Sequence, residues 1–84
     1  RNAAAYAISS MGPEAKPAVP ALIEALSDDE ATVRFPVAVA LREIGPGAAA
    51  AVPALEKALD DRNDDVAFMA KKALQKIKPD AEIP

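Results

Sequence analysis

The side chains that could do chemistry in this chain are carboxylates, amines, guanidinium groups and hydroxyls, because its 84 residues include no histidine and no cysteine. Zinc sites, disulfides, catalytic triads and the usual near-neutral general base all require one of those two residues. The composition therefore predicts a non-catalytic protein with no catalytic residues, no cofactor and no metal site.

The acidic run at residues 61–65, Asp-Arg-Asn-Asp-Asp, matches the opening of a calcium-binding loop. The remainder of such a loop is missing, because Val66 stands where the sharp turn needs glycine and Lys72 stands where the bidentate glutamate belongs. Acids at the start of a helix also cap its free N–H groups and suit its dipole. We interpret this run, and the similar run at residues 28–30, as helix-start residues.

A lysine cluster near the end of the chain could bind phosphate or an acidic partner. We favour the interpretation that these lysines only form the exposed end of the repeat array. Its members are Lys71, Lys72, Lys76 and Lys78. Residues 28–65 carry nine acids and four bases, and the net charge of the chain is −3. Phosphate backbones are bound by a surplus of basic groups, so we expect no nucleic-acid partner.

Sequence similarity at a spacing of 33 residues runs through the whole chain. The segment Val-Pro-Ala-Leu at 19–22 recurs at 52–55, and Gly12-Pro13 recurs at Gly45-Pro46, with no gap. Hydrophobic residues make up 51% of the chain and aromatic residues only 4%, so alanine dominates and helices are favoured. A period of this length in such a chain predicts a helical repeat array.

Each period contains two amphipathic helix patterns, in which apolar residues recur at i, i+3, i+4 and i+7. The first helix is expected near 16–27 and near 49–60, and the second near 31–44 and near 64–77. Glu30 and Asn63 stand at the expected N-caps of the second helices. Gly12 and Gly45 are expected to form left-handed C-caps.

The period divides one domain, residues 1–84, into a partial and two full repeats. The expected parts are the second helix of a partial repeat at 1–12, a repeat at 13–45, a repeat at 46–78 and a tail at 79–84. The chain starts at Arg1 without a methionine, so we expect it to be a fragment of a longer protein.

These motifs resemble the HEAT-like repeats, in particular the short bacterial type that also occurs in phycobilisome-lyase-like proteins. The resemblance rests on the prolines early in the first helix, Pro20 and Pro53, and on Asp28 six residues before Arg34. It implies an all-α fold, a right-handed α-solenoid of antiparallel helix pairs with about two and a half repeats.

The second repeat departs from this pattern. Asp61 is followed six residues later by Ala67 instead of an arginine, so we expect the aspartate–arginine link to be missing there. In the first repeat, Asp28 and Arg34 are expected to pair across the turn between the two helices. Asp28 can also accept backbone N–H bonds at the start of the second helix.

One side of each second helix faces away from the apolar stripe, and the resemblance implies that this side lines a concave binding surface. All three aromatic residues of the chain fall on it. The candidate partner-binding residues are Tyr6, Phe35, Val39, Arg42, Phe68, Met69, Lys72 and Lys76. The alternative is that Phe35 and Phe68 only pack between neighbouring second helices. Pro36 lies on the same side and is expected to bend its helix.

Two further expectations concern the ends of the array. Glu56 and Lys71 replace Ile23 and Ala38 of the preceding repeat on the side that faces a following repeat. Charged replacements of this kind make the outer repeat of a solenoid soluble, so the second repeat is expected to be a cap. The helix over residues 1–11 presents alanines and is expected to support weak self-association.

The function that we expect is a non-catalytic protein–protein interaction or scaffold module. The alternatives are an accessory repeat segment of a chromophore lyase-like or other modifying enzyme, which the resemblance alone suggests, and a segment that only extends a solenoid. No apolar run approaches the roughly 18–20 residues that cross a bilayer, and no signal peptide is visible. We therefore expect a cytoplasmic protein without membrane contact.

Overall fold

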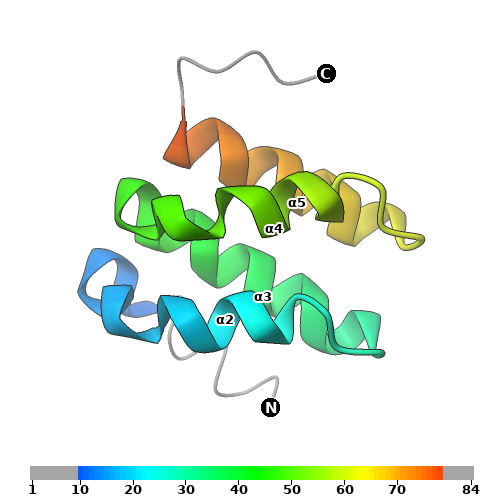
Figure 1. Cartoon of the computed structure of the whole chain (residues 1–84), viewed down its shortest axis with the longest axis horizontal. Helices are drawn as coiled ribbons and strands as arrows, with labels where there is room; N and C mark the ends of the chain where they lie inside the picture. Colours follow the sequence, from blue (N-terminus) through cyan, green and yellow to red (C-terminus); the bar gives the residue numbers. More distant parts are fainter. Residues whose placement is uncertain (1–9, 79–84) are drawn as a thin grey trace.

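The structure is a computed structural model that describes residues 10–78. Within that range every regular element is helical and no strand occurs (Figure 1). Three expectations concern residues largely or wholly outside this range. They are the role of Tyr6, the self-association through residues 1–11 and the tail at 79–84.

Each repeat consists of a 3₁₀ helix, a short α-helix and a longer α-helix. The first repeat has η1 (Gly12–Ala18), α2 (Val19–Ala25) and α3 (Ala31–Ile44). The second repeat has η2 (Gly45–Ala51), α4 (Val52–Ala58) and α5 (Asp64–Ile77). Each element starts 33 residues after its counterpart, for example Gly45 after Gly12, so the sequence period is also the structural period.

The first helix of each repeat starts later than its apolar pattern predicts, at Val19 and Val52. Pro20 and Pro53 lie in the first turn of α2 and α4, where N–H groups have no acceptor within the helix. A helix that started near residue 16 would need an N–H at position 20 to reach the carbonyl of Lys16, and proline has none. The residues before Val19 and Val52 therefore form 3₁₀ turns.

The second helices have the predicted bounds, and the glycines at the start of η1 and η2 have the predicted positive φ. Gly12 has a φ of 60° and Gly45 a φ of 72°. The ψ of Gly45 is −142°, however, which lies outside the left-handed helical region and in one that is almost exclusive to glycine. Gly45 thereby turns the chain from α3 into the next repeat.

The two N-cap predictions have different outcomes. The side-chain oxygen of Asn63 accepts hydrogen bonds from the backbone N–H groups of Asp65 and Val66, at 2.9 and 3.1 Å. Glu30 occupies the N-cap position of α3, but its side chain makes no capping bond. Instead, Oδ1 of Asp28 accepts from the N–H of Glu30 at 2.9 Å, which confirms the predicted role of Asp28 at this turn.

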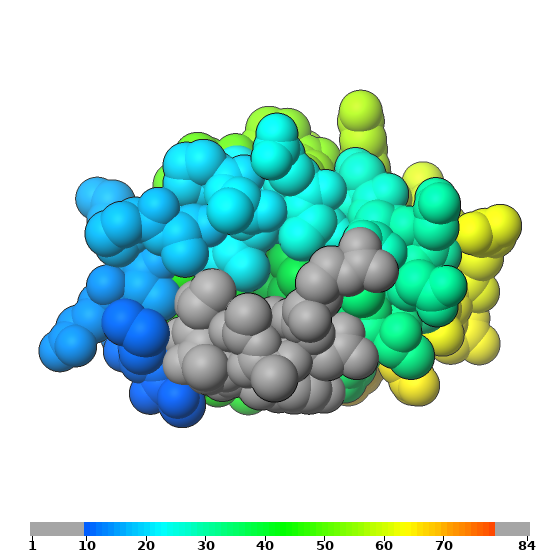
Figure 2. Space-filling view, turned by 90° about the horizontal axis from the view of Figure 1, so that it is seen from below, coloured from blue at the N-terminus to red at the C-terminus, as the bar shows by residue number. Residues whose placement is uncertain are grey.

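The helices form two layers, with α2 and α4 in one and α3 and α5 in the other (Figure 1). Figure 2 views the molecule from the side of the first repeat, with α2 at the upper left and the start of α3 at the right. The core between the layers is aliphatic, with Val37, Leu41 and Leu55 at 0–2% exposure. Buried alanines such as Ala38 and Ala70 allow α3 to pack more extensively against α5 than any other pair of elements does.

Pro36 was expected on the outward, exposed side of its helix, but the structure places it elsewhere. It is fully buried, and α3 continues through it from Ala31 to Ile44. Its ring therefore contributes to packing and does not line an exposed surface.

The stretch Ala31–Ala58 is apolar enough by length and composition to be considered as a membrane span, contrary to our expectation that no such run occurs. In the structure it comprises α3, η2 and α4, with a change of direction at Gly45. Half of its most apolar part is buried inside the protein. The 14 residues of α3 would extend only about 21 Å at 1.5 Å per residue, which is less than the hydrocarbon core.

Candidate functional site

A buried ion pair joins the two repeats. Arg34 on α3 donates from Nε to Oδ2 of Asp61 at 2.7 Å and from Nη2 to Oδ1 of Asp61 at 2.9 Å. Its third nitrogen, Nη1, donates to the backbone carbonyl of Asp28 at 2.7 Å. Only 8% and 9% of the two side chains is exposed. The guanidinium thus binds the turn of its own repeat and the turn of the next one.

Two sequence predictions about these residues need correction. The hydrogen bond between Arg34 and Asp28 is made by the backbone oxygen of Asp28, whereas the Asp28 carboxylate acts on Arg34 through its charge. The aspartate–arginine link that we expected to be missing at Asp61 is present, because the arginine comes from the preceding repeat. Arg34 lies on the side of α3 that the second repeat covers, so it hydrogen-bonds a carboxylate 27 residues away in the chain.

The protonation of this pair follows from its geometry. The hydrogen bond from Arg34 lowers the pKa of the Asp61 carboxyl below its usual value, while burial acts in the opposite direction. The N–H of Asn63 lowers the pKa of Asp61 further. The same Arg34–Asp61 hydrogen bond raises the pKa of Arg34. Both groups are therefore ionised across the neutral range, and neither is suited to exchange protons with a substrate.

The acidic run at 61–65 is occupied with structural hydrogen bonds. Oδ1 of Asp61 accepts from the N–H of Asn63 at 2.9 Å in addition to binding Arg34. Asn63 caps α5 through two backbone N–H groups. Within residues 10–78 no three acidic side chains are grouped closely enough to hold a metal ion. The geometry supports our interpretation of the run as helix-start residues.

The second helices expose an aromatic and basic surface, which we call the second-helix face. It consists of Phe35, Val39 and Arg42 on α3 and Phe68, Lys72 and Lys76 on α5. Phe68 is 56% exposed, and Nζ of Lys72 lies over its ring, 5.2 Å from the centroid. Arg42, Lys72 and Lys76 are exposed, whereas Phe35 and Val39 are half-buried.

Met69 was also expected on this face. It is half-buried and lies against the hydrophobic core. Pro36, its counterpart one repeat earlier, is fully buried. Both residues lie at the edge of the apolar stripe, and the periodicity of a single helix does not show how far a neighbouring element extends over that edge.

Phe68 also borders a depression at the outer end of the second repeat. This depression has a volume of about 520 Å³ and is lined by Glu56, Leu59, Asp60, Ala67, Phe68 and Lys71. Glu56 is exposed and Lys71 half-buried. One repeat earlier, the equivalents of Ala67 and Lys71 are Arg34 and Ala38, both buried. The sequence at this end therefore differs from that of a surface covered by a following repeat.

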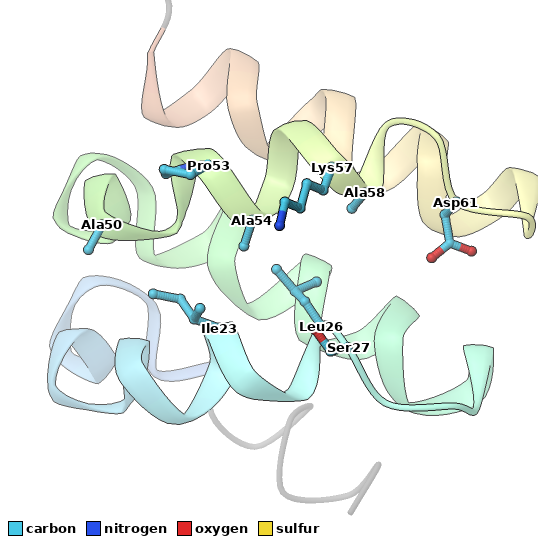
Figure 3. A pocket seen from close by; sticks show the side chains of 9 residues that line it. All are labelled: Ile23, Leu26, Ser27, Ala50, Pro53, Ala54, Lys57, Ala58 and Asp61. Atoms are coloured by element: carbon cyan, nitrogen blue, oxygen red, sulfur yellow. The ribbon is translucent and has the colours of Figure 1, made fainter.

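A groove between α2 and α4 was not anticipated from the sequence (Figure 3). Its volume is about 420 Å³, and its residues are Ile23, Leu26, Ser27, Ala50, Pro53, Ala54, Lys57, Ala58 and Asp61. The side chain of Lys57 extends into it from α4. The groove exists because α2 and α4 make little contact and the side chains of α4 that face α2 are small. The small side chains of Ala54 and Ala58 are the sequence feature from which this groove could have been predicted.

Comparisons with known proteins agree with this architecture. A family model described as HEAT repeats matches residues 1–75. No curated protein and no solved structure matches the chain. HEAT repeats generally mediate protein–protein interaction or scaffolding and are typically non-catalytic. Since the match extends over most of the 84 residues and the helix pairs follow the sequence period, the chain belongs to the HEAT repeat family.

Proposed function

We propose that this chain is a protein-interaction module that binds its partner on the second-helix face. The observation that carries the proposal is the exposure of Phe68, at 56%, in a domain whose other described large hydrophobic side chains, apart from Met11, are buried or half-buried. An aromatic ring buries roughly 150–250 Å² when it is covered. An exposed ring among charged groups is typical of the anchor residues of interfaces.

The remainder of the face supports the same proposal. Phe35 and Val39 on α3 add half-buried apolar surface, and Arg42 adds an exposed guanidinium. Aromatic residues and arginine are enriched at protein interfaces relative to other surface. The close packing of α3 on α5 holds these side chains on two rigid helices, which reduces the entropy lost on binding.

Photo-crosslinking tests this proposal directly. Benzoylphenylalanine is placed at position 68, and in a matched variant at position 21, where Ala21 is exposed on α2. We expect the probe at 68 to form a discrete adduct in cells of the source organism, and the probe at 21 to form none. Equal adducts from both positions, or an adduct only from 21, would contradict a partner on the second-helix face.

A substitution gives an independent measurement. Phe68→Ser is expected to reduce recovery of the crosslinked partner at least tenfold when the crosslinker is moved to position 39. The melting temperature should change little, since the ring of Phe68 is more than half exposed. Retained crosslinking in this variant would show that Phe68 is not an anchor.

A further inference from the structure

The cations of the second-helix face indicate the chemistry of its partner. Resting on the function proposed above, we propose that this face binds an acidic peptide segment with an apolar anchor residue. The cations are Arg42, Lys72 and Lys76, and the apolar positions beside them are Val39 and Phe68.

These three cations are available for a partner. All three are exposed, and none of them forms an ion pair within residues 10–78, where the recorded salt bridge joins Arg34 to Asp61. Lys72 contacts an aromatic ring instead of a carboxylate. A charge held over a ring keeps its hydrogen-bond donors free at the outer side.

The cations of the two helices gather at one end of the face. The Cγ and Cε atoms of Lys76 lie 3.9 Å from the position that a Cβ on Gly45 would occupy. The stem of Lys76 therefore lies against the C-terminal end of α3, the end that also carries Arg42. Lys72 is one turn before Lys76 on α5, so all three cations lie toward the C-terminal ends of the two helices, and we call them the basic strip.

Helix dipoles explain the positions of only two of the three cations. Cations in the last turn of a helix are favoured by its dipole, and Arg42 and Lys76 lie in such turns. Lys72 lies before the last turn of α5, above Phe68. Its placement is explained better by a surface that combines charge with an apolar ring.

The charges elsewhere in the molecule favour a short peptide over a nucleic acid. The opposite ends of α3 and α5 begin beside acidic turns, at 28–30 and 60–65, and the chain as a whole carries a net charge of −3. A polyanion long enough to extend along both helices would also approach these acids, which repel it over about a Debye length, roughly 10 Å. A short segment with alternating acidic and apolar residues would contact only the basic strip and Phe68.

Fluorescence anisotropy with the full chain tests this inference. The probe is a fluorescein-labelled peptide that repeats glutamate, glutamate and leucine; the comparisons are the same peptide with lysine in place of glutamate and a thymidine oligonucleotide of equal length. We expect only the acidic peptide to bind, with an affinity that falls as salt is added.

The variants are matched in charge. The triple variant R42Q/K72Q/K76Q is expected to bind the acidic peptide at least tenfold more weakly. A control triple variant, K16Q/K57Q/R62Q, removes three exposed cations from other surfaces and should bind within about twofold of the original chain, as expected for charges that only act at long range. Circular dichroism melts establish that both variants fold.

Three results would overturn the inference: equal binding of the lysine peptide, equal loss in the two triple variants, or tighter binding of the oligonucleotide. Its failure can be told apart from failure of the proposed function. If position 68 crosslinks a partner while the acidic peptide does not bind, the face is an interaction site of different chemistry. If position 68 gives no adduct and Phe68→Ser leaves peptide binding intact, the proposed face itself is wrong.

Discussion

Arg34 in the first repeat and Asp61 in the second form a two-bond pair, Nε to Oδ2 at 2.7 Å and Nη2 to Oδ1 at 2.9 Å. This pair and the carbonyl of Asp28 satisfy the guanidinium at the junction of the repeats. Both side chains are less than a tenth exposed, so removal of one partner leaves the other charge poorly hydrated. The junction therefore depends on both partners of the pair.

Asp61→Asn is expected to lower the free energy of unfolding by about 1.5–3 kcal/mol, the range for a hydrogen bond to a charged group. Urea denaturation at neutral pH measures the change. The matched control is Asp60→Asn at the exposed neighbouring position, for which about 0.5 kcal/mol or less is expected. Similar effects of both substitutions would mean that the salt bridge does not stabilise the junction.

The stability of the protein is expected to depend on pH through Asp61. Its pKa is lowered in the folded state, chiefly by the hydrogen bond from Arg34, so the unfolded chain binds the proton more readily. The stabilisation is complete above the unfolded pKa of about 3.9 and is lost as the pH falls through the lower folded value. Urea midpoints at pH 7 and pH 3 should therefore differ less for Asp61→Asn than for the original chain. An unchanged difference would contradict this linkage.

The two second helices are expected to respond differently to loss of the N-cap side chain. Asn63→Ala removes two hydrogen bonds, to the N–H groups of Asp65 and Val66, and should destabilise the protein by about 1 kcal/mol. Glu30→Ala removes no capping bond and should change stability by a few tenths at most. Thermal melts followed by circular dichroism compare the two; an equal loss at both positions would refute the assignment of the caps.

Gly45→Ala is expected to destabilise the fold by about 1–3 kcal/mol, the typical strain of a side chain in such a backbone region. The φ of 72° and ψ of −142° at this position are unfavourable for any residue with a Cβ. Gly47→Ala is the control, because its backbone has no positive φ and its Cβ would meet the flexible stem of Lys16 at 3.4 Å. Hydrogen exchange of α3 and of α4 would show whether the turn between the repeats loosens in Gly45→Ala alone.

The sequence alone determined the repeat architecture and the bounds of the second helices. The 33-residue period, the glycines at 12 and 45 and the cap at Asn63 act over a few residues, and local backbone rules are enough to interpret them. The start of the first helices was also accessible in principle, since Pro20 and Pro53 forbid the hydrogen bond that an earlier start requires.

Only the tertiary structure decided which partner each outward side chain meets. The spacing of Asp28 and Arg34 suggested a pair within one repeat, but the carboxylate that binds Arg34 belongs to Asp61 of the next. Helical periodicity likewise placed Met69 outside the core, where the structure packs it against the core. The physical reason is that a sequence pattern gives the direction of a side chain around its own helix, whereas burial and ion pairing depend on how far and at what angle the neighbouring repeat packs over it.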